Sequence, residues 1–129
     1  MRSFKTLTVW EKSHQLTLRV YKESKAFPSD EKFGLTSQLR RATASVPANI
    51  AEGCGRSTDA ELRRFLEIAM GSASEVEYHL LLARDLGYMA QQQYAELEVL
   101  TSEVKRMLSG FIKKLRSDQQ SAVSKKRAK

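Results

Sequence analysis

Two stripes of side chains run along residues 35–56 at helical spacing. The first is apolar or small and consists of Leu35, Leu39, Ala42, Val46, Ile50 and Gly53. The second can hydrogen-bond throughout and consists of Gln38, Arg41, Ser45, Asn49, Glu52 and Arg56. Because residues three and four apart share a helix face, the segment predicts a helix that packs through one stripe and offers the other as a polar surface. Pro47 lacks a backbone donor and clashes with the carbonyl four residues earlier, so we expect a kink near Thr43–Pro47 and a carbonyl that needs another partner.

The polar stripe has two interpretations. Serine and asparagine are poor helix formers that usually have a partner inside a helix, which favours a structural network with the next helix. The predicted members of this network are Asn49, Glu52, Ser72, Glu75 and His79. Arginines are equally compatible with phosphate binding, because a guanidinium group pairs with phosphate through two hydrogen bonds. The candidate nucleic-acid-binding residues of this region are Arg40, Arg41, Arg56, Arg63 and Arg64.

Three more helices are indicated by the hydrophobic periodicity. They are predicted over residues 8–25, from a capping box at residues 58–61 to a C-cap at Gly87, and over residues 91–116. Ser29 or Asp30 is the expected N-cap of the second helix, and the glycines of Gly53-Cys54-Gly55 are expected to end it in the left-handed conformation. Short connections then predict an all-α, antiparallel up-down four-helix bundle with its second helix kinked at Pro47. We expect this domain to cover residues 1–116 and the basic residues 117–129 to form a disordered tail.

Two positions bear on how the helices pack. Gly71 lies in the middle of the third helix, where glycine costs about 1 kcal/mol relative to alanine, so we expect a neighbouring helix to approach closely there. Trp10 lies in a wide apolar sector of the first helix. This side chain either packs inside its own bundle or anchors a contact with another copy of the chain.

The longest motif resembles a known family. The string QLRRATASVPANIAEGCGR at residues 38–56 is followed by RFL at 64–66, IA at 68–69, GSA at 71–73 and Glu75. These residues are similar to the signature of the 23S rRNA intervening-sequence proteins, small bacterial four-helix proteins that also resemble the accessory variability protein of diversity-generating retroelements. The resemblance begins near Phe4 and fades after about Leu115. It implies a homo-oligomeric ring, by analogy a homopentamer, and RNA as a partner.

Composition and motifs argue against several classes of protein. No apolar run approaches the roughly 20 residues of a membrane span, and the N-terminus lacks a signal peptide, so we expect a cytoplasmic protein without membrane contact. Cys54 is the single cysteine, which agrees with a reducing compartment. Without a nucleophile motif or a P-loop, we expect no enzymatic activity, no cofactor and no small-molecule substrate. We also expect no metal, because Glu11 and His14 form one Glu-x-x-His pair where a di-iron bundle needs two.

The net charge of +7 is concentrated near the C-terminus. Residues 113–129 hold seven bases and one acid, a net of +6, which leaves +1 for residues 1–112. Lys125, Lys126 and Arg127 are therefore further candidate nucleic-acid-binding residues. The leading hypothesis is a non-enzymatic oligomer that holds structured RNA or an RNA-processing protein on a basic surface. Aromatic residues are scarce beside the arginines, so RNA recognition is expected through backbone and shape. The alternative is a structural or adaptor oligomer whose partner is a protein.

Overall fold

The chain folds into four α-helices. The computed structural model describes residues 2–128, and it describes side chains for residues 2–123. The helices are α1 (Thr8–Glu23), α2 (Leu35–Cys54), α3 (Asp59–Asp85) and α4 (Gln91–Ala128), with short 3-10 helices η1 (Phe4–Thr6), η2 (Ser24–Ala26) and η3 (Ser29–Glu31). Across the described range there is no β-strand. The predicted all-α class is therefore confirmed.

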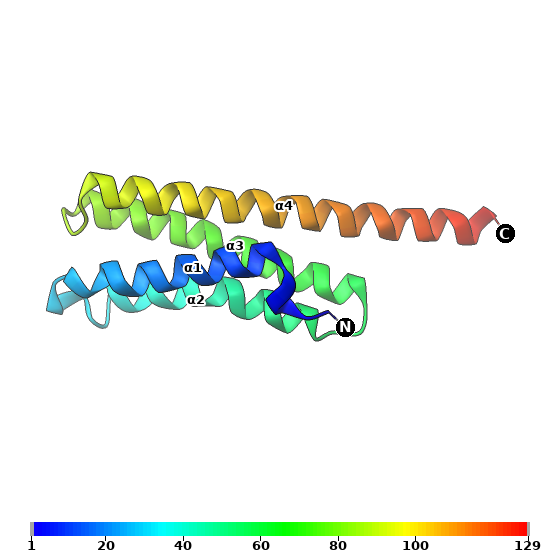
Figure 1. Ribbon diagram of the computed structural model, residues 1–129, viewed down its shortest axis with the longest axis horizontal. Helices are drawn as coiled ribbons and strands as arrows, with labels where there is room; N and C mark the ends of the chain where they lie inside the picture. Colours follow the sequence, from blue (N-terminus) through cyan, green and yellow to red (C-terminus); the bar gives the residue numbers. More distant parts are fainter. Residues whose placement is uncertain (1, 129) are drawn as a thin grey trace.

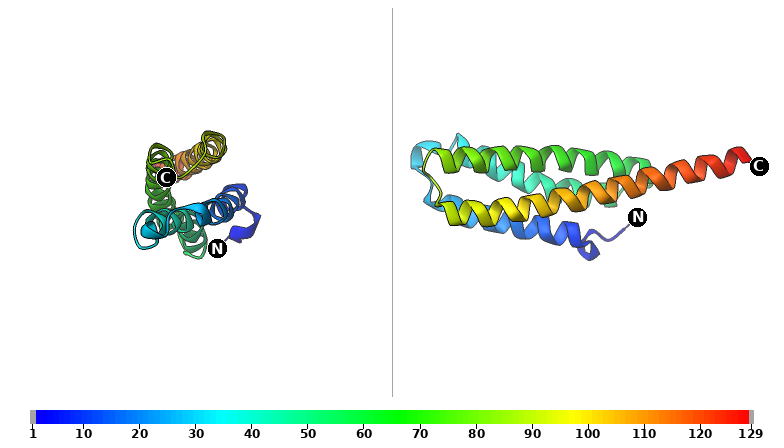
Figure 2. Two further views of the ribbon diagram at one scale, coloured as in Figure 1. Left: turned by 90° about the vertical axis from the view of Figure 1, so that its left-hand side faces the viewer. Right: turned by 90° about the horizontal axis from the view of Figure 1, so that it is seen from above.

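The four helices pack side by side, and successive helices run in opposite directions (Figure 1). Helix α1 contacts α2 and α4, and α3 contacts the same two helices, so each helix has two neighbours around a shared core. The α1–α2 and α3–α4 connections lie at one end of the molecule, whereas the N-terminus and the α2–α3 connection lie at the other (Figure 1). The C-terminal end of α4 extends past that other end (Figure 2). The N-terminal end of α2 therefore lies at the end of the molecule that holds the α3–α4 connection, and its C-terminal end lies at the end that holds the N-terminus of the chain.

Each helix contributes one apolar stripe to the core. The apolar stripe predicted for residues 35–53 is buried along its whole length, which confirms the helical period of this segment. Fully buried side chains come from all four helices: Leu16, Val20, Leu39, Val46, Ile50, Leu66, Val76, Leu80, Leu97, Val104, Leu108 and Leu115. Burying one such side chain is worth about 1.5–3 kcal/mol, so this core holds the four helices together.

Helix α2 continues through Pro47 without a break in its helical assignment. Thr43 lies four residues before Pro47, so its carbonyl lacks the usual helical donor. The nearest donor is the Thr17 hydroxyl on α1, at 3.4 Å from the Thr43 oxygen. The same hydroxyl lies 2.8 Å from the carbonyl oxygen of Ser13. A hydroxyl has one proton to donate, so the shorter bond to Ser13 is the stronger of the two. The Thr43 carbonyl thus has the Thr17 hydroxyl as a weak donor in place of the missing backbone N–H. The kink at Pro47 stays a prediction.

Three predicted helix ends differ from the structure. Helix α1 ends at Glu23 rather than Lys25 and passes into η2. Helix α2 begins at Leu35, after η3 and Gly34, and not at Ser29 or Asp30. Helix α4 runs to Ala128, twelve residues beyond the expected end at Arg116, because residues 117–128 contain neither glycine nor proline and include good helix formers. The division at residue 116 into a domain and a tail stays a prediction.

The glycines correct two further expectations. A Cβ atom at Gly71 would have no neighbour within 4 Å, so the close helix approach predicted there is wrong. The close approach lies at Gly53, where a Cβ would stand 2.9 Å from Leu62 Cδ1 and 2.9 Å from Phe65 Cβ. Gly55 caps α2 with φ −82°, which is not left-handed, whereas Gly87, the predicted cap of the third helix, follows α3 with a positive φ of +78°. Gly53 is thus required by packing.

Candidate nucleic-acid interface

The predicted arginines separate into two groups at opposite ends of α2. Arg41 and Arg56 are fifteen residues apart, which is about 22 Å along a helix. Arg63 and Arg64, in the first turns of α3, lie at the same end as Arg56. We call the two regions the α1–α2 corner and the α2–α3 corner. The α1–α2 corner consists of Tyr21, Lys32, Phe33, Thr36, Ser37, Arg40 and Arg41. The α2–α3 corner consists of Arg2, Glu52, Arg56, Asp59, Arg63, Arg64, Glu67 and Arg116.

Most cations of the α2–α3 corner are paired with carboxylates. Arg56 Nη2 lies 2.7 Å from Glu52 Oε1, and its guanidinium also covers the ring of Phe65. Glu67 accepts Arg116 at 3.2 Å and lies 3.8 Å from Arg63. Arg2 reaches Asp59 at 3.5 Å. Arg64 is exposed and is the one arginine of this corner without a carboxylate partner among the described side chains.

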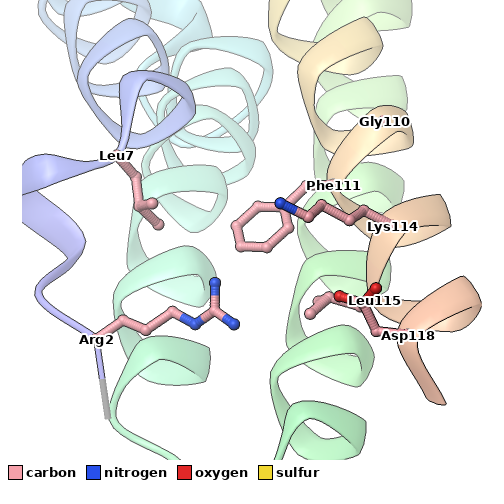
Figure 3. A pocket seen from close by; sticks show the side chains of 7 residues that line it. All are labelled: Arg2, Leu7, Gly110, Phe111, Lys114, Leu115 and Asp118. Atoms are coloured by element: carbon pink, nitrogen blue, oxygen red, sulfur yellow. The ribbon is translucent and has the colours of Figure 1, made fainter. Parts of the chain in front are cut away.

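A hollow of about 430 Å³ lies beside this corner, between the N-terminal segment and α4. Figure 3 shows Arg2 on one side and Phe111, Lys114 and Asp118 on the other. The guanidinium carbon of Arg2 lies 5.6 Å from the centre of the Phe111 ring, and the backbone N–H of Arg2 donates to the carbonyl of Cys54 at 3.0 Å. Because charges of both signs line the hollow, its attraction for a polyanion is small.

The α1–α2 corner surrounds a hollow of about 510 Å³ and carries cations with no carboxylate partner. Arg40 donates from Nε to the Ser24 hydroxyl at 2.8 Å and from Nη2 to the Tyr21 carbonyl at 3.2 Å. Both acceptors are neutral, so the charge of Arg40 is fixed in place without being cancelled. Arg41 is exposed, and among residues 2–123 neither Lys32 nor Arg41 has an ion-pair partner.

The loop of the α1–α2 corner is held by one carboxylate. Glu31 Oε1 accepts the backbone N–H of Leu35 at 3.2 Å, and its Oε2 accepts the Tyr88 hydroxyl at 2.9 Å. The hydrogen bond to Glu31 raises the pKa of Tyr88, and desolvation and nearby negative charges add to this effect. Glu31 therefore supplies the helix cap that was assigned to Ser29 or Asp30, and it ties the start of α2 to the α3–α4 connection.

Sequence reasoning missed the aromatic residues of this corner. Phe33 lies in the loop before Gly34 and is 89% exposed, and Tyr21 lies beside Arg40. The expectation that aromatics are scarce near the arginines holds for the neighbourhood along the chain and fails in space. The exposed ring could have been predicted from one local pattern. Phe33 stands between a lysine and a glycine in the segment that separates two amphipathic helices.

The predicted polar network divides into separate contacts. Ser45 and Ser72 hydroxyls are 2.9 Å apart and link α2 to α3, and Asn49 donates to the Ser45 carbonyl at 2.8 Å and to its hydroxyl at 2.9 Å. His79 Nε2 lies 3.2 Å from Glu75 within α3. Glu52 joins neither contact, since it pairs with Arg56. Thus Ser45, absent from the predicted set, makes the contact between the helices.

Two remaining predictions concern residues elsewhere. The side chains of Lys125, Lys126 and Arg127 lie outside those that the structure describes. Trp10 is half-buried and stacks on His14 with ring centres 5.0 Å apart. Its ring centre lies 4.9 Å from that of Phe4. Its role as an anchor between copies stays a prediction.

Cys54 is the single cysteine of the chain and the first candidate for a reactive group. Cys54 is buried, and burial raises the pKa of its thiol although the charge of Arg2 opposes the shift. The thiol is therefore protonated at neutral pH and is a weak nucleophile. In the described part of the chain, no three His, Cys, Asp or Glu side chains gather closely enough to hold a metal ion. The helices there also lack a stretch long and apolar enough to cross a membrane.

The fold and these surfaces define a small all-α protein of four helices with one basic corner. The sequence matches the 23S rRNA-intervening sequence protein family over residues 5–110. The protein belongs to this family, which confirms the resemblance inferred from the motif. A crystal structure of a protein of unknown function from the S23 ribosomal protein family of Bacteroides thetaiotaomicron is similar, with 27% identity and a TM-score of 0.75. The alignment covers 81% of this chain and 95% of that one. No curated protein gives a significant match.

Proposed function

We propose that this protein is a non-enzymatic, cytoplasmic oligomer that binds structured RNA associated with rRNA. The observation that carries the proposal is the α1–α2 corner, where Lys32, Arg40 and Arg41 keep their charges free of carboxylates within the described residues. Free cations release the counterions of a phosphate backbone when they bind it, and paired cations contribute far less. The family's link to an rRNA intervening sequence supports RNA as the polyanion. Lys125, Lys126 and Arg127 then add affinity for any RNA sequence.

The test compares two arginines of the same polar stripe. Arg41→Gln and Arg56→Gln each remove one charge from α2, one free and one paired with Glu52. A fluorescently labelled RNA hairpin with an apical loop is titrated with each protein at several salt concentrations. Arg41→Gln should weaken binding and flatten the salt dependence by about one unit, and Arg56→Gln should change both less. Equal affinity of Arg41→Gln and the parent at every salt concentration would contradict the proposal.

We propose further that copies of the chain assemble as a ring, by resemblance a homopentamer. An apolar strip between α1 and α4 supports self-association: Leu18 is 57% exposed and Val99 is 61% exposed, with Leu100 between them. Arg19 and Glu103 border this strip, so it carries both charge signs. In a ring, a second and different surface of the neighbouring copy covers the strip. Light scattering should give a multimer for the parent and a smaller mass for Leu18→Asp. A matched control is Leu86→Asp, outside the strip.

A protein-binding adaptor is the second candidate function, and the same apolar strip favours it. Under this function the oligomer binds a different protein through Leu18 and Val99. Its binding to that partner is then insensitive to ribonuclease and is weakened by Leu18→Asp. RNA binding by Arg41→Gln would under this function equal that of the parent. The RNA titration and the ribonuclease control therefore separate the candidates.

A further inference from the structure

Two aromatic rings stand at the mouth of the α1–α2 corner. Phe33 is 89% exposed and Tyr21 is 42% exposed, and both line the same hollow of about 510 Å³. Phe33 does not pack against the core cluster, so the fold gains little from its ring. A single exposed apolar residue needs no explanation, but two exposed rings beside free cations form a chemically specific surface.

The cations lie directly over these rings. Lys32 Nζ is 5.5 Å from the centre of the Phe33 ring, and the guanidinium carbon of Arg40 is 4.9 Å from that of Tyr21. Arg41 completes the rim of the hollow. Rings that accept the faces of bases, interleaved with cations that accept phosphates, are the arrangement by which single-stranded nucleic acids are bound.

The loop that carries Phe33 is already ordered by its contacts. Glu31 holds the start of α2 and the Tyr88 hydroxyl at once, and it lies across Gly34, where a Cβ would come within 2.7 Å of Glu31 Oε1. Arg40 is likewise fixed by Ser24 and Tyr21. A surface that is rigid before binding loses less conformational freedom when a ligand arrives.

We propose that the α1–α2 corner binds unpaired nucleotides of RNA, with bases stacked on Phe33 and Tyr21 and phosphates beside Lys32, Arg40 and Arg41. This inference rests on the proposed function and specifies which part of a structured RNA is held, namely a loop or a single-stranded end. A base-paired helix keeps its bases stacked on one another and offers none to a ring. An acidic peptide would use the cations and gain nothing specific from the two rings.

The test compares two RNA probes and three substitutions of Phe33. The probes are a labelled 12-nucleotide oligouridylate and a blunt-ended 12-base-pair RNA duplex, and binding is followed by fluorescence anisotropy. Phe33→Ala and Phe33→Leu should each weaken oligouridylate binding about tenfold, because both lose the ring. Phe33→Trp should bind as tightly as the parent. The matched control is Tyr78→Ala, which removes an exposed ring from α3 and should change binding less than twofold. Duplex binding should be the same for all variants.

The remaining outcomes overturn the inference in distinguishable ways. If Phe33→Leu binds oligouridylate like the parent, the contact is apolar and not stacking. If the parent binds only the duplex, the inference fails while the proposed function stands, and if it binds neither probe nor an RNA hairpin, both fail. A smaller mass of Phe33→Ala in light scattering would assign Phe33 to a contact between copies and would also overturn the inference. Circular dichroism checks that each variant is folded.

Discussion

The two ends of α2 both carry arginines and differ in what those arginines contact. At the α2–α3 corner, Arg56 is 2.7 Å from Glu52 and Arg116 is 3.2 Å from Glu67, so positive charge is cancelled where it stands. At the α1–α2 corner, Arg40 is anchored by a hydroxyl and a carbonyl, and Arg41 extends from the surface. By the number of basic residues alone, the α2–α3 corner would be the better candidate for binding a polyanion. Because most of its cations are paired with carboxylates, the α1–α2 corner is the better candidate.

The backbone differs between the same two ends. Gly53, at the α2–α3 corner, faces the body of α3, because the nearest atoms to a Cβ there are Leu62 Cδ1 and Phe65 Cβ. At Gly34, in the α1–α2 corner, the nearest atom to a Cβ is the carboxylate oxygen of Glu31, and the other near atoms belong to the Glu31 backbone at 3.8 and 3.9 Å. The α2–α3 corner is thus closed by packing and by ion pairs. The α1–α2 corner is closed by one carboxylate, which leaves its ring and cations open to a ligand.

The largest expected effect is on folding. Gly53→Ala should lower the free energy of unfolding by about 2 kcal/mol, because the new methyl group overlaps Leu62 and Phe65 and α3 must move. Gly71→Ala is the matched control and should raise stability by up to about 1 kcal/mol, since its Cβ meets nothing. Urea denaturation measures both. Equal effects at the two positions would show that α2 and α3 are not packed as described.

The next prediction concerns the ion pairs of the α2–α3 corner. Glu52→Gln together with Glu67→Gln releases Arg56, Arg63 and Arg116 from their partners. The α2–α3 corner then resembles the α1–α2 corner, so binding of a labelled RNA hairpin at low salt should tighten several-fold. The loss of stability should be below about 1 kcal/mol per pair, since exposed ion pairs contribute little. Glu11→Gln together with Glu98→Gln, on α1 and α4, controls for the change of two in net charge. An unchanged affinity would mean that pairing does not decide which corner binds.

The smallest expected effect is a pH dependence of folding stability at the α1–α2 corner. Because the hydrogen bond to Glu31 raises the pKa of Tyr88, the folded state favours the neutral phenol. Its contribution to stability is fully present below pH about 10, the ordinary tyrosine pKa, and is lost as the pH rises through the higher pKa of the folded state. Tyr88→Phe should be slightly less stable at neutral pH and should lose less stability than the parent above pH 10. Thermal unfolding at several pH values provides the measurement, and parallel curves for both proteins would contradict the assignment.

Features that depend on neighbours along the chain were predictable. The buried stripe of α2, the Thr58 cap of α3 and the positive φ of Gly87 follow from local spacing and local chemistry. Thr58 Oγ1 accepts the N–H of Glu61 at 3.1 Å, as the capping motif predicts. Helix ends were less predictable, because the start of α2 depends on a side chain, Glu31, that also binds the α3–α4 connection.

Features that depend on distant residues were not predictable. The Arg56–Glu52 pair is local, because Glu52 stands four residues before Arg56, and no acidic residue lies three or four positions from Arg41. The contacts that hold Arg40, with Ser24 and Tyr21 sixteen and nineteen positions away, do not follow from the local sequence. Glu67 and Arg116 are separated by 49 positions, so their contact exists only in the folded chain. The role of a glycine is equally hidden, since Gly53 and Gly71 look alike in sequence and only Gly53 is closely packed.

The central claim is that RNA lies on the α1–α2 corner, and photo-crosslinking tests it most directly. An RNA hairpin with 4-thiouridine in its loop is irradiated with the parent protein, and tryptic peptides that carry RNA are identified by mass spectrometry. The account predicts crosslinks in peptides that contain Phe33 or Tyr21. Crosslinks confined to peptides that contain Arg56, Phe65 or residues 117–124 would contradict it.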